Sequence, residues 1–101
     1  MFVLELTYIA PVERVDELLA AHVEWLDALY RDGVVIASGR KNPRDGGVLL
    51  AVGDDRARVE ELIRADPFIS GGVGEYRVTE FYATKTAPEL APYRQQLPGT
   101  A

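Results

Sequence analysis

Apolar and polar residues alternate at the start of the chain, which predicts a β-strand over residues 2–9. Apolar residues then recur at helical spacing, which predicts a helix that starts near Pro11 and ends before Gly33. Its apolar stripe consists of Val15, Leu18, Leu19, His22, Trp25, Leu26 and Leu29. His22 is the one titratable residue of this stripe, because an imidazole titrates near neutral pH. On a buried helix face, such a ring needs a hydrogen-bond partner or has a functional role.

The same two periods continue along the rest of the chain. They predict strands over residues 34–39 and 48–52, a helix after them, a flexible Gly-rich connection over 70–74 and a strand over 75–84. Asp54 or Asp55 can cap this second helix, and Pro67 should end it. The third strand is apolar on both faces, which indicates a central position. The last strand carries bulky groups on both faces, so we expect it to be covered on both sides.

The order of these elements is βαββαβ, which indicates an α+β protein of the ferredoxin-like class. That fold has a four-stranded antiparallel sheet with two helices on one face. The other face would be left open, with Val3, Ile9, Thr79 and Phe81 able to point outward. Because a small domain rarely exposes a broad apolar sheet to water, we expect a homodimer that pairs through these open faces. We expect one domain over residues 1–85, followed by a C-terminal tail over 86–101.

Composition and charge narrow the class of protein. The formal net charge is −5 in 101 residues, which argues against a nucleic-acid or anionic-membrane partner. The sequence has no cysteine and a single histidine, so we expect no metal site. It also has no glycine loop of the kind that binds phosphate, and we expect no cofactor. No signal-peptide or membrane-spanning run is present, so we expect a cytoplasmic protein.

The best candidate partner for His22 is Asp66, which lies at the end of the second helix. The two helices run antiparallel on one sheet face in this topology, so the two side chains can meet. A carboxylate that accepts from one ring nitrogen fixes the tautomer and raises the basicity of the other nitrogen. Two simpler readings stay open. His22 can be a core-edge residue bonded to a backbone carbonyl, and Asp66 can cap the local backbone of an Asp-Pro turn.

Five further residues are candidates for substrate binding. Gly39 would let a ligand approach the backbone, and Arg40 could hold a carboxylate or phenolate oxygen. Ser38 and Ser70 could donate to a ligand, and Phe68 could line an apolar pocket. The alternatives are a strand that ends in a solvated arginine, a serine that belongs to the Gly-rich loop, and an aromatic residue of the ordinary core.

Taken together, these segments resemble the YciI-like family of the dimeric α/β-barrel superfamily. The resemblance covers roughly residues 1–85, and its pieces are the first strand, His22-Val23-Glu24-Trp25-Leu26, Ala37-Ser38-Gly39, Gly47 to Val52, Ala65-Asp66-Pro67-Phe68 and the closing strand. It implies a ferredoxin-like fold dimerised through the sheets, similar to muconolactone isomerases, and an active site built on His22 and Asp66. Dehydrochlorination of a chlorinated hydroxyquinol is one activity of the family. This chain departs at Arg40, where the family often has proline, and in a short loop after it.

The residues and the resemblance together suggest a small cofactor-independent enzyme. His22 would move a proton on a cyclic or aromatic, anionic small molecule, and Asp66 would orient the imidazole. The reaction would be an isomerisation or an elimination, including dehydrochlorination. One alternative is a non-catalytic dimeric domain that binds a small molecule or serves as an accessory domain. Another is a metal-free monooxygenase that acts on a quinol.

Overall fold

Strand β1 (Phe2–Tyr8) lies inside a four-stranded sheet, between β3 (Gly46–Ala51) and β4 (Gly74–Glu80). Strand β2 (Val35–Arg40) pairs with the other side of β3, so the strand order is β2-β3-β1-β4 and every pairing is antiparallel. This computed structural model describes residues 1–99. The ferredoxin-like α+β fold and the internal position of the third strand, both predicted from the sequence, are confirmed.

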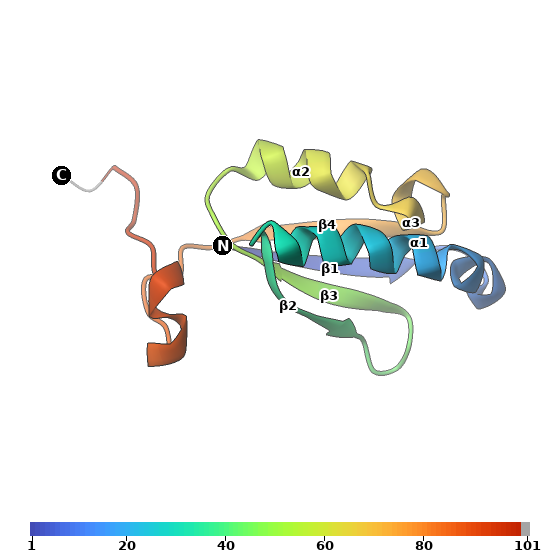
Figure 1. Cartoon of the computed structure of the whole chain (residues 1–101), viewed down its shortest axis with the longest axis horizontal. Coiled ribbons are helices and arrows are strands. Elements are labelled where there is room, and N and C mark those ends of the chain that lie inside the picture. The colour runs from blue at the N-terminus through green and yellow to red at the C-terminus, as the bar shows by residue number, and fades with distance from the viewer. Residues whose placement is uncertain (100–101) are drawn as a thin grey trace.

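The α-helices of the chain cover one side of this sheet (Figure 1). Helix α1 (Val12–Arg31) follows Pro11 and ends before Gly33, whose φ of +72° suits the turn into β2. Helix α2 (Arg56–Arg64) is capped by Asp55, whose carboxylate accepts from the Arg58 N–H at 3.1 Å. Helix boundaries at Pro11, Gly33 and Asp55 therefore agree with the capping signals in the sequence.

The segment after α2 differs from the prediction. Asp66 caps a further single turn, α3 (Pro67–Ser70), where the sequence indicated only a turn and a flexible connection. The last strand ends at Glu80, four residues before its predicted end. It forms an edge of the sheet, and alternate residues along it are exposed, so within one chain it is not covered on both faces as expected.

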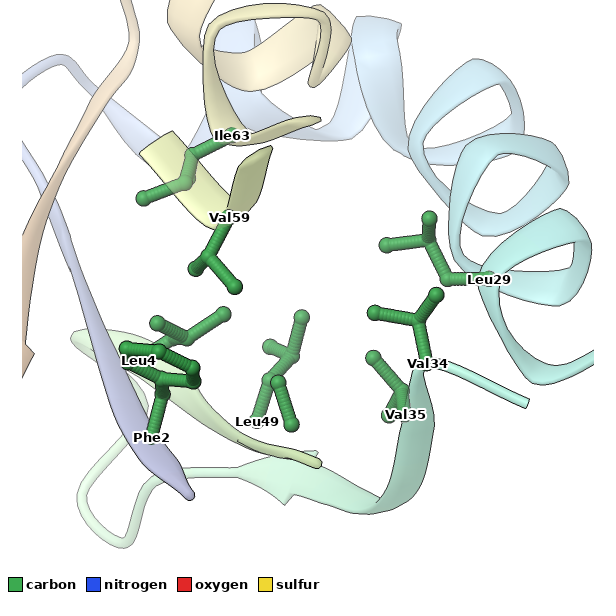
Figure 2. Packing of buried hydrophobic residues seen from close by; sticks show 9 residues of the cluster. Phe2, Leu4, Leu29, Val34, Val35, Leu49, Val59 and Ile63 are labelled. Atoms are coloured by element: carbon green, nitrogen blue, oxygen red, sulfur yellow. The ribbon is translucent and has the colours of Figure 1, made fainter. Parts of the chain in front are cut away.

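The helices bury two apolar clusters against the sheet. The larger one contains Phe2, Leu4, Leu29, Val34, Val35, Leu49, Ala51, Val59 and Ile63. In Figure 2, Val59 of α2 points towards the β-sheet residues Leu4 and Leu49. The smaller cluster contains Leu6, Val15, Phe68 and Val73. Because α1 contributes to both clusters, it fixes the residues on its buried stripe relative to the sheet.

The opposite face of the sheet has no helix over it. Strand alternation places Val3 and Thr79 on that face, together with Val48, which is 37% exposed. Ile9 and Phe81 just beyond the strands are exposed at 54% and 40%. These are the residues predicted to point outward, with Val48 added.

The chain after β4 runs away from the end of the sheet at which the chain begins (Figure 1). It contains a 3-10 helix, η1 (Pro88–Tyr93), with no buried residue. Gln95 ties it to the domain, since its side chain accepts from the Ala83 N–H at 2.9 Å and donates to the Gly53 carbonyl at 3.1 Å. Residues 100–101 of the predicted tail lie outside the described part. None of the helices in residues 1–99 is long and apolar enough to span a membrane.

Candidate active site

His22 and Asp66 are in direct contact. His22 lies on the buried stripe of α1, and Asp66 precedes the first residue of α3. The distance between His22 Nδ1 and Asp66 Oδ1 is 2.8 Å, although 44 residues separate them in the chain. His22 is 8% exposed and Asp66 is fully buried. The contact predicted from the βαββαβ topology is therefore present, and it is a buried ion pair whenever the imidazole is protonated.

Asp66 also accepts two other hydrogen bonds. Its Oδ1 accepts from the Phe68 N–H at 2.9 Å, which caps α3, and its Oδ2 accepts from the Tyr76 hydroxyl at 2.6 Å. The capping role and the pairing with His22, considered as alternatives in the sequence, thus occur together. Three donors around a fully buried carboxyl group give the pattern expected for an ionised carboxylate, with the His22 proton on Nδ1.

Tyr76 was missing from the residues predicted for the site. It lies on β4, opposite Leu6 of β1, and so on the face that carries the helices. Burial, and to a lesser extent the Asp66 carboxylate, raise the pKa of Tyr76 well above its usual value, so the phenol stays protonated and donates. The sequence does carry one signal for this residue: strand alternation puts Tyr76 on the helix-facing side, where a buried phenol needs a hydrogen-bond partner.

Two aromatic rings hold the His22 imidazole. Phe68 stacks on it with ring centroids 4.0 Å apart and an interplanar angle of 7°. Trp25, one turn along α1, lies 5.5 Å away at a tilt of 34°. With Nδ1 bonded to Asp66, the second ring nitrogen, Nε2, has no hydrogen-bond partner among the described residues. The ring is therefore fixed in plane and tautomer, and one nitrogen is left for a ligand.

His22 lines a cavity of about 170 Å³ between α1 and the sheet. The other residues around it are Leu6, Tyr8, Leu19, Val23, Leu26, Ser38, Gly39, Arg40, Gly46, Gly47, Leu49 and Phe68. Most of this lining is apolar, with a few polar groups, as in ligand pockets generally. Gly47 lies directly opposite Leu6 in the sheet, and a Cβ atom there would lie 3.0 Å from the Gly39 carbonyl oxygen.

Four of the five predicted substrate-binding residues meet at this cavity. Ser38, Gly39, Arg40 and Phe68 line it together with His22. Arg40 has no ion-pair partner within residues 1–99, whereas the Ser38 hydroxyl is hydrogen-bonded to the Tyr30 hydroxyl at 2.5 Å. Ser70 is not brought to the cavity, because α3 ends there with Ser70 exposed at the surface.

Within residues 1–99, neither a metal-binding cluster nor a second groove, between α2 and β4, offers an alternative site that includes the imidazole. The described residues contain no cluster of three or more histidine, aspartate or glutamate side chains that could bind a metal ion. A wider, open groove of about 430 Å³ runs between α2 and β4. The smaller cavity is the candidate site, because the chain's single histidine lines it and does not line the groove.

Comparison with known proteins agrees with this fold. The family model described as "YCII-related domain" matches residues 1–82. A solved structure of similar fold is 5-chloro-2-hydroxyhydroquinone dehydrochlorinase (TftG) from Burkholderia phenoliruptrix, in complex with 2,5-dihydroxybenzoquinone. The two chains are 20% identical with a TM-score of 0.63, over 80% of this chain and 93% of the other. No curated protein sequence matches. Since the family model covers most of the chain, this protein belongs to the YCII-related family.

Proposed function

We propose that this protein is a small enzyme in which the His22–Asp66 pair moves a proton on a single-ring, anionic small molecule. The observation that carries this proposal is the buried 2.8 Å contact between His22 Nδ1 and Asp66 Oδ1, beside a cavity that the imidazole lines. Asp66 orients the ring through Nδ1, so Nε2 is the nitrogen that exchanges protons with a substrate.

The chemistry that suits this arrangement is isomerisation or elimination. As a general base, Nε2 takes a proton from the substrate, and Asp66 stabilises the imidazolium that forms. In an isomerisation the imidazolium returns the proton to another position. In an elimination such as dehydrochlorination, the electron pair left behind expels chloride from the ring. An acid–base group of this kind contributes roughly 10²–10⁴-fold to the rate.

The size and charge of the cavity support a single-ring substrate. Its volume of about 170 Å³ is close to that of a cavity of about 150 Å³ that holds benzene. Arg40, which has no anionic partner in the described chain, supplies a cation for a phenolate or carboxylate oxygen. The similar dehydrochlorinase was solved with 2,5-dihydroxybenzoquinone, a single six-membered ring with four oxygens.

Chloride release from 5-chloro-2-hydroxyhydroquinone, followed with a chloride electrode, tests this proposal. We expect turnover by the wild-type protein and a loss of at least about 100-fold in kcat for His22→Gln. Arg40→Gln should raise KM, whereas Arg31→Gln, which removes an exposed arginine at the end of α1, should change neither constant. Binding of 2,5-dihydroxybenzoquinone by calorimetry without turnover would contradict catalysis of this elimination and favour the alternative of a binding domain.

The same proposal includes a homodimer formed through the open sheet face. Val3, Val48, Phe81 and Ile9 give that face an apolar content that a second copy of the chain would cover. Sedimentation velocity at micromolar concentration should give twice the monomer mass of 11.1 kDa. Val48→Lys places a charge at the centre of the face and should shift the protein towards monomer. A wild-type monomer at this concentration would refute the pairing.

A further inference from the structure

Among residues 1–99, the hydroxyl of Tyr76 has one hydrogen-bond partner, the Oδ2 atom of the catalytic candidate Asp66, at 2.6 Å. Its ring packs against both apolar clusters, one around Leu4 and the other around Leu6. Tyr76 therefore has little freedom to place its hydroxyl elsewhere. The hydrogen bond spans ten residues of sequence and connects the edge strand β4 to the N-terminal cap of α3.

We propose that Tyr76 is a positioning residue that tunes the His22–Asp66 pair. Its hydroxyl fixes the rotation of the Asp66 carboxylate, so that Oδ1 faces both His22 Nδ1 and the Phe68 N–H. It also draws part of the negative charge towards Oδ2, which limits how strongly Asp66 holds a proton on the imidazole. The importance of this tuning for catalysis rests on the function proposed above, whereas the hydrogen-bond network does not.

Asp66 supplies the negative charge next to His22. The titratable groups that bond to the pair or line its cavity are Asp66 at the start of α3, Tyr76 on β4, Tyr8 on β1 and Arg40 on β2. Strand β3 (Gly46–Ala51) carries no titratable side chain. Asp66 is thus the single carboxylate among these groups. The protonation of His22 therefore depends on how the negative charge of Asp66 is shared among its three hydrogen-bond donors.

The sign of the effect follows from this sharing. Tyr76→Phe leaves Oδ2 buried without its donor, so the charge of Asp66 is less well stabilised. A protonated imidazole on Oδ1 then compensates that charge more, because the competing donor is gone. The pH midpoint of the His22 titration should therefore rise in Tyr76→Phe. Removing the charge itself with Asp66→Asn should lower the same midpoint.

NMR titration of the His22 ring in the full chain tests the proposal, with Tyr82→Phe as the matched control. Tyr82 is 39% exposed and donates to neither member of the pair, so its variant should leave the midpoint unchanged. A tyrosine that served only to fill the core would leave the His22 midpoint where it is after Tyr76→Phe. An unchanged or lowered midpoint in Tyr76→Phe would therefore overturn the proposal.

A second measurement covers the case in which Tyr76→Phe does not fold. In the wild-type protein, the hydroxyl proton of Tyr76 should exchange slowly and change its chemical shift at the same pH midpoint as the His22 ring. A hydroxyl resonance that does not follow the His22 titration would also overturn the proposal. Neither readout needs a substrate, so a protein that is inactive but shows both effects would refute the proposed enzyme activity and leave Tyr76 as the positioning residue.

Discussion

Asp66→Ala removes the acceptor of three buried hydrogen bonds at once. The donors that lose it are His22 Nδ1, the Phe68 N–H and the Tyr76 hydroxyl, at 2.8, 2.9 and 2.6 Å. Loss of a helix cap costs about 1 kcal/mol, and each buried donor left without a partner costs about 1–3 kcal/mol. With the Phe68 N–H counted in the cap, these contributions sum to about 3–7 kcal/mol, a range that includes the roughly 3–5 kcal/mol typical of removing one partner of a buried pair. That is a large part of the roughly 5–15 kcal/mol that stabilises a domain.

Two other variants separate the contributions to this loss. Asp66→Asn keeps the shape and one carbonyl acceptor, so we expect it to cost about 1–2 kcal/mol. Asp55→Ala removes a helix cap of the same residue type, but at an exposed position with a single acceptor contact to the Arg58 N–H. It should cost about 1 kcal/mol. The difference between Asp66→Ala and Asp55→Ala thus measures the buried network beyond the cap.

Urea unfolding at pH 7, followed by tryptophan fluorescence, is a suitable assay. Trp25 is the single tryptophan of the chain, and its Nε1 donates to the Leu62 carbonyl at 3.1 Å, so its emission reports on the packing of α1 against α2. Equal dependence on urea in all variants would show that only stability has changed. The reasoning would be refuted if the losses of stability in Asp66→Ala and Asp55→Ala differed by less than about 0.5 kcal/mol, which is the usual effect of a surface substitution that breaks no specific contact.

Two further predictions concern the sheet and the buried phenol. Gly46→Ala would place a Cβ atom 1.8 Å from the Leu6 carbonyl oxygen, so it should lower the free energy of unfolding in urea by at least about 1–3 kcal/mol. In the control Gly39→Ala, the added Cβ meets nothing within 4 Å and should cost little stability. Equal losses of stability in the two variants would contradict the close packing of β1 and β3. Because burial raises the pKa of Tyr76, the unfolded chain loses its phenolic proton near pH 10 before the folded chain does. The wild-type protein should therefore lose about 1.4 kcal/mol of stability per pH unit above pH 10 relative to Tyr76→Phe; parallel stability curves from pH 9 to 11 would contradict this.

Much of the fold could be predicted because period and capping are local properties. The alternation in the first strand, the helical stripe through His22 and the glycine after the first helix each depend on neighbouring residues. The contact between His22 and Asp66 needed one further step, since the βαββαβ order places both helices antiparallel on one sheet face. The family resemblance named the same two residues.

The parts that could not be predicted depend on longer-range or single-atom interactions. A four-residue helix such as α3 has no period to detect, and it exists because Asp66 accepts from the Phe68 N–H. That turn also carries Ser70 to the surface, away from the cavity it was expected to reach. The position of Tyr76 on the helix-facing side of its strand followed from alternation, but its partner did not, because alternation gives a face and no distance.

The most direct test of the central claim, that Asp66 controls the charge on His22, is the NMR titration of His22 in the wild-type protein and in Asp66→Asn. The structure places the two side chains 2.8 Å apart and out of water, so the carboxylate should favour the protonated imidazole. We predict that Asp66→Asn lowers the His22 midpoint. A midpoint that stays the same or rises would contradict the pair as an acid–base unit.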